Sequence, residues 1–329
     1  MKSQPKASGP RHPDRTAIVI LNWNQCAETL ACVESVLSLE GSDWAAIVVD
    51  NGSTEPLLEP LRELLHARRV PFQVLDGGRR KAPASGALAA LRLPENRGYA
   101  GGNNAGIEAA LEWGFDWIMV VNNDVRLPPD SLQRLLAVAR DSADVGLVGC
   151  RILARPEFGE REQYGGGRLL YALGVYLLWR WKGRSGVHDV NFVPGCAFLA
   201  RAAALAQVGL LDERYYLYSE DIELSHRLLE HGWRLLVDLD AHVWHGFSVS
   251  LGGRRTPLYY YYVTRNTLLF IKERLQGMTR LLSRLAFLAQ MAAHCVQWLA
   301  TGRRDLVRAT WRGFQDYRRQ RYGPVLSKV

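Results

Sequence analysis

The sequence predicts an α/β protein in which helices flank a mostly parallel central sheet, followed by a helical C-terminal extension. Three observations carry this prediction. Short, uniformly apolar runs are typical of strands that are buried on both faces. These runs alternate with segments whose apolar residues recur at helical spacing, which favours parallel pairing with right-handed crossovers. Beyond residue 259 the pattern is helical.

The first two predicted strands and the helix between them form one βαβ unit. Residues 16–21 and 45–49 are continuous apolar runs, and apolar residues recur at helical spacing over 27–39. Elements of this order and length match a strand, a crossover helix and a parallel strand. Residues 1–15, which are polar and contain three prolines, are predicted to form a flexible tail.

The same alternation continues to about residue 150. Helical spacing predicts helices at 57–65 and at 129–140. The glycine-rich segment 96–106 is predicted to lead into a further helix that runs through Trp113, and apolar runs predict strands at 117–121 and 145–148. The stretch 70–93 is harder to interpret, and its residues 77–85 are predicted to be a surface loop.

The pattern becomes less regular after residue 150. An apolar segment spans 192–200, a helix is predicted from Glu220, and 234–239 resembles a strand. We place a domain boundary near 251–257, because the chain beyond it is helical and increasingly basic. The sequence therefore divides into the tail, a main domain of residues 16–250 and an extension of residues 251–329.

Composition narrows the class of protein. With 48% hydrophobic and 22% charged residues, the chain of 329 residues can bury a sizeable core. The N-terminal tail lacks the apolar region of a signal peptide, so secretion is not expected. Five scattered cysteines without a Cys-x-x-Cys pair predict neither a disulfide framework nor a zinc site, and they favour a reducing cytoplasm.

Positive charge is concentrated at the C-terminal end. Residues 272–329 contain twelve Lys or Arg and three acids, whereas the first 271 residues contain 29 basic and 30 acidic residues. The apolar segment 281–300 is interrupted by an arginine, a histidine and two glutamines, so it is a poor membrane span. This extension either binds an anionic membrane surface or packs on the main domain as a helical pair with a solvated basic face.

Polar side chains follow three of the predicted strands. They are Asn22 and Asn24 after the first strand, Asp50 after the second, and Asn122, Asn123 and Asp124 after the strand at 117–121. Parallel strands end at the same edge of a sheet, where ligands bind, so these side chains are predicted to line one crevice. A carboxylate beside amides suits Mg²⁺ or Mn²⁺, and Asp50 is suited to a base or ribose. The alternative is turn chemistry, because Asn and Asp readily hydrogen-bond their own backbone.

The segment that begins with Asn96, Arg97 and Gly98 is a second candidate. Its glycines allow close approach of a ligand. The segment precedes the start of a helix, whose first N–H groups are predicted to face phosphate. Neither G-x-G-x-x-G nor G-x-x-x-x-G-K-[ST] occurs in the chain. This absence argues against a dinucleotide oxidoreductase and a P-loop NTPase.

Two further groups carry titratable side chains. Glu220 and Asp221 follow a tyrosine-rich stretch at a helix start. Either Ser219 caps this helix and the acids favour its dipole, or one carboxylate, held among aromatics, is a general base. His245 is either a packed side chain or a neutral metal ligand.

In their order and spacing, these segments resemble the family 2 inverting glycosyltransferases, which have the Rossmann-like GT-A fold, and among them the rhamnosyltransferase-like branch. The similarity covers about residues 16–250. It rests on Val-Ile-Leu-Asn-Trp-Asn at 19–24, Val-Asp-Asn-Gly-Ser at 49–53, Glu-Asn-Arg-Gly-Tyr-Ala-Gly-Gly-Asn-Asn at 95–104, Val-Asn-Asn-Asp at 121–124, Ser-Glu-Asp-Ile-Glu-Leu at 219–224 and Trp-His-Gly at 244–246.

The resemblance implies roles for individual residues. Residues 16–125 would be the nucleotide-sugar-binding half, with Asp50 at the base, and 126–250 the acceptor and catalytic half. Asp124, at the last position of the D-x-D motif, and His245 would bind the metal. Asp221 would be the catalytic base, with Glu220 beside it. Asn122 stands where many relatives carry the first Asp, so it is expected to serve the sugar or ribose. The rest of the predicted donor-binding set is Asn22, Asn24, Asn96, Arg97, Gly98 and Asn123.

The resemblance thus predicts metal-dependent, inverting transfer of a sugar from a nucleoside-diphosphate sugar, expected to be dTDP-rhamnose. The acceptor would be a hydroxyl of a polysaccharide or a lipid-linked glycan. The reaction would occur in the cytoplasm, with the extension as a candidate anchor on the inner face of the membrane. Two other interpretations remain, a catalytically silent nucleotide-sugar-binding module and a basic nucleic-acid-binding protein. Nucleic acid is not expected as a partner, because no recognised nucleic-acid module is present.

Overall fold

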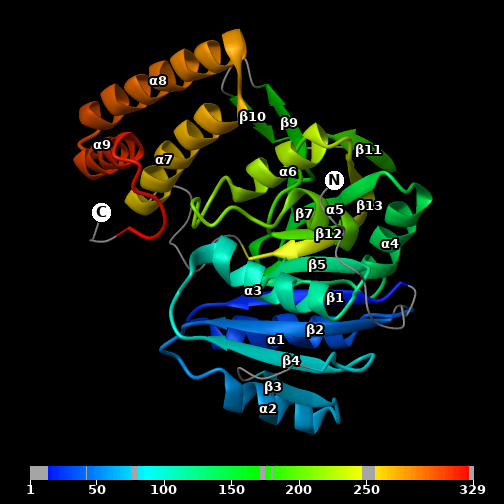
Figure 1. Cartoon of the computed structure of the whole chain (residues 1–329). Helices are drawn as coiled ribbons and strands as arrows, with labels where there is room; N and C mark the ends of the chain where they lie inside the picture. The colour runs from blue at the N-terminus through cyan, green and yellow to red at the C-terminus, as the bar shows by residue number, and fades with distance from the viewer. Residues whose placement is uncertain are drawn as a thin grey trace, which may run out of the picture.

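A computed structural model describes residues 14–41, 43–75, 81–159, 161–170, 175–178, 181, 183–246 and 256–325. Its main sheet has the strand order β11-β13-β7-β12-β5-β1-β2-β4-β3, with helices on both faces, and the C-terminal helices lie beyond one end of it (Figure 1). Most of the predicted tail and part of the predicted loop 77–85 lie outside the described residues.

The first half of the sheet is parallel, as the alternation predicts. It consists of β1 (Thr16–Asn22), β2 (Trp44–Asn51), β3 (Phe72–Leu75), β4 (Leu88–Leu93) and β5 (Trp117–Asn122). Alternate residues of β1 enter different cores: Ile18 packs in the core shared with α1 (Cys26–Leu37), α2 (Leu58–Ala67) and α4 (Ser131–Asp141). Val19 packs in the core shared with α3 (Gly98–Glu112).

The stretch 70–93 contains both β3 and β4, neither of which was predicted. β4 is buried between two strands, whereas β3 is a short edge strand whose Val74 is exposed. A four-residue edge strand carries too little apolar periodicity to be recognised.

The second half of the sheet is mixed. β12 (Ala197–Arg201) runs antiparallel between β5 and β7 (Val145–Ala154), so β7 is not a direct neighbour of β5. β13 (Arg234–His245) pairs parallel with β7 across an irregularity between Asp238 and His242, and so continues well beyond the predicted strand at 234–239. The remaining elements before the extension are β6 (Val125–Arg126), η1 (Pro156–Phe158), β8 (Glu162–Tyr164), β9 (Gly167–Leu170), β10 (Val175–Leu178), β11 (Val187–Val190), α5 (Ala202–Val208) and α6 (Glu220–Glu230).

Close packing against the sheet explains the glycines of α3. A Cβ on Gly102 would stand 2.4 Å from Cδ1 of Leu21, and one on Gly106 would stand 2.5 Å from Cγ1 of Val19. These distances are too short for real contacts. The glycines at 102 and 106 therefore allow α3 to pack closely on the sheet. At these two positions packing explains the glycine, whereas the sequence predicted close approach of a ligand.

The C-terminal extension consists of α7 (Pro257–Arg274), α8 (Gly277–Ala300) and α9 (Arg304–Arg318). In Figure 1, α8 is the outermost helix, and α7 is the member of the three nearest to α6. The predicted boundary at 251–257 falls mostly outside the described residues. None of the helices in the part of the chain that the structure describes has the length and apolar character that crossing a bilayer requires.

Candidate functional site

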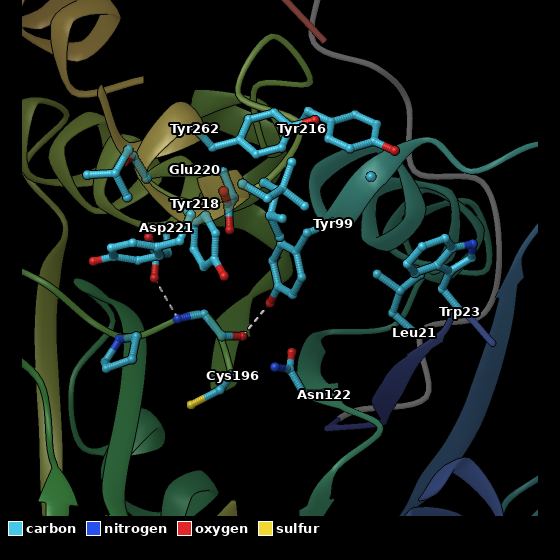
Figure 2. Close-up of a pocket in the computed structure, with 18 of the residues that line it drawn as sticks. Leu21, Trp23, Tyr99, Asn122, Cys196, Tyr216, Tyr218, Glu220, Asp221 and Tyr262 are labelled. Atoms are coloured by element: carbon cyan, nitrogen blue, oxygen red, sulfur yellow. Dashed lines mark hydrogen bonds between the residues drawn. The ribbon is translucent and has the colours of Figure 1, made fainter. Parts of the chain in front are cut away.

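A cavity of about 550 Å³ lies at the carboxyl edge of the sheet, between the ends of β1, β2 and β5 and the start of α6 (Figure 2). Its floor includes predicted site residues, and its upper wall is aromatic. The polar lining side chains are Gln25, Asn51, Asn96, Asn122, Asn123, Asp124, Ser219, Glu220, Asp221, His245 and Thr267.

Strand alternation decides which strand-end residues reach the cavity. In the register of the sheet, Leu21 is opposite Asn122, while Asn22 is opposite Asp50. Successive side chains of a strand point to opposite faces, so Leu21, Asn51 and Asn122 share one face and Asn22 and Asp50 the other. The first three line the cavity, and Asn22 and Asp50 do not.

Asn22 is the centre of a buried hydrogen-bond network on that second face. Its Nδ2 donates to Ser53 Oγ at 3.0 Å and to Asp50 Oδ1 at 3.4 Å, and its Oδ1 accepts from Thr29 Oγ1 at 2.8 Å. Asn123 joins the network through Thr29, at 3.0 Å. These contacts give Asn22 a structural role, and a donor contact by Asn22 stays a prediction.

Asp50 is 3% exposed, and its Oδ2 lies 3.8 Å from Nε of Arg92. The base contact that the resemblance assigns to Asp50 likewise stays a prediction.

Asn24 joins two loops: its Oδ1 accepts from the N–H groups of Thr54 and Glu55 at 2.8 and 3.1 Å.

The amide of Asn51 holds the loop that precedes α3. It donates to Asn96 Oδ1 at 3.0 Å and to the Gly98 carbonyl at 2.9 Å, and it accepts from the Arg97 N–H at 2.9 Å. Asn96 and Gly98 line the cavity. Arg97 does not line it, and its Nη2 donates to both carboxylate oxygens of Glu213, at 2.9 and 3.0 Å.

The start of α3 does not present free N–H groups to a phosphate, contrary to the sequence prediction. The Tyr99 N–H donates to the Tyr216 carbonyl at 2.7 Å, the Ala100 N–H to the same oxygen at 3.3 Å, and the Gly98 N–H to Asn96 Oδ1 at 2.7 Å. Gly98 has φ +72°, and a Cβ there would lie 2.4 Å from that carbonyl. The glycine therefore allows Tyr216 to cap the helix.

Asp124 and His245 meet across the sheet edge. Val125 of β6 pairs with His245 of β13, and this pairing brings His245 Nε2 to 3.3 Å from Asp124 Oδ1. Both side chains are buried. Burial opposes ionisation of Asp124, but the hydrogen bond and charge of His245 and the charge of Arg155 outweigh it and lower the pKa of this carboxyl. Asp124 is therefore ionised at neutral pH.

Glu220 and Asp221 lie at the start of α6. Ser219 occupies the N-cap position in the left-handed region (φ 73°), and its side chain makes no capping hydrogen bond. Burial, and then the charge of Asp221, raise the pKa of Glu220 well above its usual value. The two neighbouring carboxyls thus have different environments, a pattern that is common at catalytic sites.

Gly195 connects Asp221 to α3. Its N–H donates to Asp221 Oδ2 at 2.9 Å, and its carbonyl accepts from the Tyr99 hydroxyl (Figure 2). The second oxygen of Asp221 accepts from the Ile222 N–H at 2.9 Å. Cys196, next in the chain, lines the cavity, but burial raises the pKa of its thiol to about 12, so it is not a thiolate nucleophile.

Several residues of the site were missed from the sequence. Leu258, Tyr259, Tyr262, Val263 and Thr267 of α7 line the cavity, as do Pro324 and Val325. The rings of Tyr216 and Tyr262 stack with centroids 5.6 Å apart (Figure 2). The extension is therefore part of the cavity wall. The signal that was available is the run of tyrosines at 259–262, near the start of this helix.

A mixed α/β sheet with a polar crevice at its carboxyl edge is typical of a nucleotide-using enzyme. Comparison with known proteins defines the family. The sequence model described as Glycosyl transferase family 2 matches residues 17–209, and the one described as Glycosyl transferase family group 2 matches residues 117–303. The chain belongs to glycosyl transferase family 2, as the motifs predicted.

Two curated relatives are similar over most of the chain. The N-acetylglucosaminyl-diphospho-decaprenol L-rhamnosyltransferase of Mycobacterium tuberculosis is 27% identical over 270 residues, which cover 73% of this chain and 87% of the relative. The galactofuranosyltransferase GlfT1 of Mycolicibacterium smegmatis is 28% identical over 267 residues, which cover 75% of this chain and 78% of the relative. These relatives confirm that the chain is a rhamnosyltransferase-like glycosyltransferase.

Solved structures confirm the GT-A fold. GalNAc-T7 with UDP, GalNAc and Mn²⁺ superposes with a TM-score of 0.59 and 14% identity, covering 79% of this chain and 49% of that one. The mannosyltransferase PcManGT from Pyrobaculum calidifontis, in complex with GDP-Man and Mn²⁺, superposes with a TM-score of 0.57 and 14% identity. The match covers 96% of this chain and 88% of that one.

Proposed function

We propose that this glycosyltransferase transfers rhamnose from dTDP-rhamnose, with inversion, to a hydroxyl of a lipid-linked glycan. The observation that carries the proposal is the placement of Asp221 and the Asp124–His245 pair around one cavity. The relatedness to a rhamnosyltransferase whose name specifies a diphospho-decaprenol acceptor supports the choice of sugar and acceptor.

In this mechanism, Asp221 accepts the proton of the acceptor hydroxyl. The hydroxyl oxygen bonds to the anomeric carbon as the bond from that carbon to the diphosphate oxygen breaks, so the anomeric centre inverts. The two N–H groups that donate to Asp221 hold its carboxylate in place. Burial and the charge of Asp221 raise the pKa of Glu220, which favours its neutral form beside that carboxylate. Asn122, whose side chain lines the cavity, is placed to contact the sugar or ribose.

We propose Asp124 and His245 as the ligands of Mg²⁺ or Mn²⁺. A buried carboxylate oxygen fits this role, because Asp124 Oδ1 has only His245 within hydrogen-bonding distance among the described residues. The described residues contain no group of three or more His, Cys, Asp or Glu that could hold a metal. Two protein ligands suit a cation that takes its remaining ligands from diphosphate and water. Such a cation would offset the charge of the departing diphosphate.

A ligand screen tests this function. Thermal unfolding of the full chain would be followed with dTDP, UDP and GDP and their sugars, each with Mn²⁺ or with EDTA. We expect dTDP and dTDP-rhamnose to raise the Tm by several degrees in Mn²⁺ only, because a ligand that binds the folded state stabilises it. Stabilisation by UDP or GDP alone would overturn the choice of base, and stabilisation by none would overturn the proposed function.

We also propose that the enzyme works on the cytoplasmic face of an anionic membrane, which the exposed face of α8 would contact. Met278, Leu285, Val296 and Leu299 are 67%, 56%, 68% and 55% exposed. Helical geometry places them, with Leu281, Leu282, Ala289, Ala292 and Ala293, on one side. Phe287, Met291 and Trp298 are buried on the opposite side.

The polar residues that interrupt the sequence of α8 lie off this exposed face. At 100° per residue, Gln290 and Gln297 project from one flank and Arg284 from the other, so the face itself is uncharged. Trp311 of α9 is 58% exposed, and Arg304 and Arg308 lie on its side of that helix. An apolar face together with surface arginines and a tryptophan fits an anionic lipid surface. The five free cysteines are compatible with a reducing compartment.

Vesicle flotation tests the lipid contact with matched variants of one helix. The double variant Leu281→Ser and Leu285→Ser removes two residues from the exposed face, and Gln290→Ser with Gln297→Ser changes two on the flank. We expect the first to weaken binding to phosphatidylglycerol vesicles about tenfold and the second to leave it within about twofold. Equal binding by both variants, or a dimer in light scattering that only the first disrupts, would contradict a membrane role for this face.

A further inference from the structure

The loop that leads into Glu220 and Asp221 has an unusual backbone. Tyr216, Tyr218 and Ser219 have φ angles of 64°, 66° and 73°. Residues other than glycine seldom adopt the left-handed region, and they stay there only where surrounding groups hold them. Loop 215–219 therefore requires partners outside itself.

Asn266 of α7 is the main partner of this loop. Its Nδ2 donates to the carbonyls of Tyr215, Leu217 and Tyr218 at 2.9, 2.8 and 2.7 Å. Its Oδ1 accepts from Arg265 Nε at 2.9 Å, which fixes the orientation of the amide. The side chain is fully buried, so water cannot take its place.

Arg265 supports the same contact. Its guanidinium is fully buried and donates to the carbonyls of Tyr215 and Gly323 at 2.8 and 2.6 Å, and it lies 4.9 Å from the centroid of Tyr262. A buried cation needs partners of this kind, and here backbone carbonyls and an aromatic face supply them. The guanidinium thus contacts Asn266, the loop and the chain at Gly323, and holds the three together.

Two other contacts fix loop 215–219 and helix α6. The Tyr216 carbonyl accepts from the start of α3, so successive carbonyls of the loop are held by different helices. Beyond the loop, Arg274 at the end of α7 pairs with buried Glu223 of α6. α7 therefore contacts both the loop and the helix that carries Asp221.

We propose that Asn266 is a positioning residue for glycosyl transfer. By holding three carbonyls of loop 215–219, it sets the backbone from which Glu220 and Asp221 extend, and so the direction in which Asp221 meets the acceptor hydroxyl. This role rests on the proposed function of Asp221. It also makes the C-terminal extension part of the catalytic unit.

The test compares Asn266→Ala with a matched control, Asn104→Ala. Asn104 is also a buried asparagine outside the cavity. Its Nδ2 donates to the Leu211 carbonyl at 2.8 Å and to Glu213 Oε1 at 3.1 Å, and its Oδ1 accepts from the Leu211 N–H at 3.1 Å. In hydrogen exchange of the full chain, we expect peptides covering 215–222 to exchange at least tenfold faster in Asn266→Ala, and at the wild-type rate in Asn104→Ala. This measurement requires no substrate.

Kinetics provide the second readout. We expect Asn266→Ala to lower kcat about 100-fold, the scale of a displaced catalytic group, while the Kd for dTDP with Mn²⁺ changes less than about threefold. Adding Ser219→Gly, which accepts a positive φ freely, should restore kcat at least threefold. If Asn266→Ala does not fold, Asn266→Ser, which keeps one donor, is measured in the same way.

The outcomes separate the two proposals. Wild-type kcat and exchange in folded Asn266→Ala, or an equal loss of kcat in Asn104→Ala, would overturn the role of Asn266. A wild-type chain that transfers no sugar would instead overturn the proposed function, and hydrogen exchange would then still decide whether Asn266 holds the loop.

Discussion

The two sides of the cavity are positioned by different means. On one side, Asn51 and Asn122 extend from ends of strands whose register and alternation place them. On the other, Glu220 and Asp221 follow a loop whose carbonyls are bonded by a side chain about 50 positions later in the chain. A sheet edge tolerates the loss of a single contact, because many ladder bonds define it. The loop depends on a few buried groups, so single substitutions should affect it more.

The largest effect is expected for Asp221→Asn on the loop side. An amide cannot accept the proton of the acceptor hydroxyl, so the transfer rate should fall about 10³-fold, while dTDP affinity is retained. Single-turnover transfer and calorimetric titration measure the two quantities. Glu230→Gln, at the far end of the same helix, is the control and should keep full activity. Unchanged turnover in Asp221→Asn would refute the assignment of the base.

On the strand side, Asp124→Ala should act on binding. Removing the carboxylate is expected to weaken Mn²⁺-dependent donor binding about 10- to 100-fold. Titration of Mn²⁺ at fixed dTDP measures this change, and Asp130→Ala, which removes an exposed carboxylate paired with Arg134, is the control. An unaltered Mn²⁺ titration would remove Asp124 from the metal site.

Asn22→Ala sharpens the comparison between the two faces of the strand ends. The substitution removes the buried bonds to Asp50, Ser53 and Thr29, so we expect the free energy of unfolding to fall by about 2–3 kcal/mol in urea denaturation. Donor affinity of the folded fraction should change less than about threefold. A loss of affinity without a loss of stability would instead support the donor contact predicted from the sequence.

Glu220→Gln should have the smallest effect, and it should depend on pH. The pKa of Glu220 is raised above its usual 4.5 in the folded state. The unfolded chain therefore releases this proton at a lower pH than the folded chain does, and the free energy of unfolding falls as the pH rises above about 4.5. Gln cannot titrate, so the variant should unfold about 2 °C higher at pH 7 and at the wild-type temperature near pH 4. A difference in Tm that does not vary with pH would argue against a raised pKa of Glu220.

Much of the strand-side architecture was predictable because its signals are local. The apolar runs of β1, β2 and β5 and the polar residues after them lie within a few positions of one another. Their parallel order then follows from general rules of α/β proteins. The sequence did not reveal which face each polar residue would occupy, because that depends on the position at which each strand ends. One position separates Asp50 from Asn51, and only Asn51 lines the cavity.

The loop side was less predictable for a physical reason. The segment Tyr215–Tyr218 and the residues Arg265 and Asn266 are individually uninformative, and their function arises from contacts between distant parts of the chain. β12 likewise enters the sheet between β5 and β7 although it follows β7 by more than 40 residues. Neither arrangement leaves a periodic pattern that sequence inspection can detect.

Gly195 also has a mechanical consequence. Its carbonyl is bonded to Tyr99 of α3 and its N–H to Asp221 of α6, so only the φ and ψ rotations of one residue separate the two bonds. A Cβ here would lie 3.1 Å from the Tyr99 hydroxyl and 3.3 Å from Cβ of Asp221, so a larger residue at this position would crowd both side chains. α3 and the helix that carries Asp221 are therefore joined through a single residue.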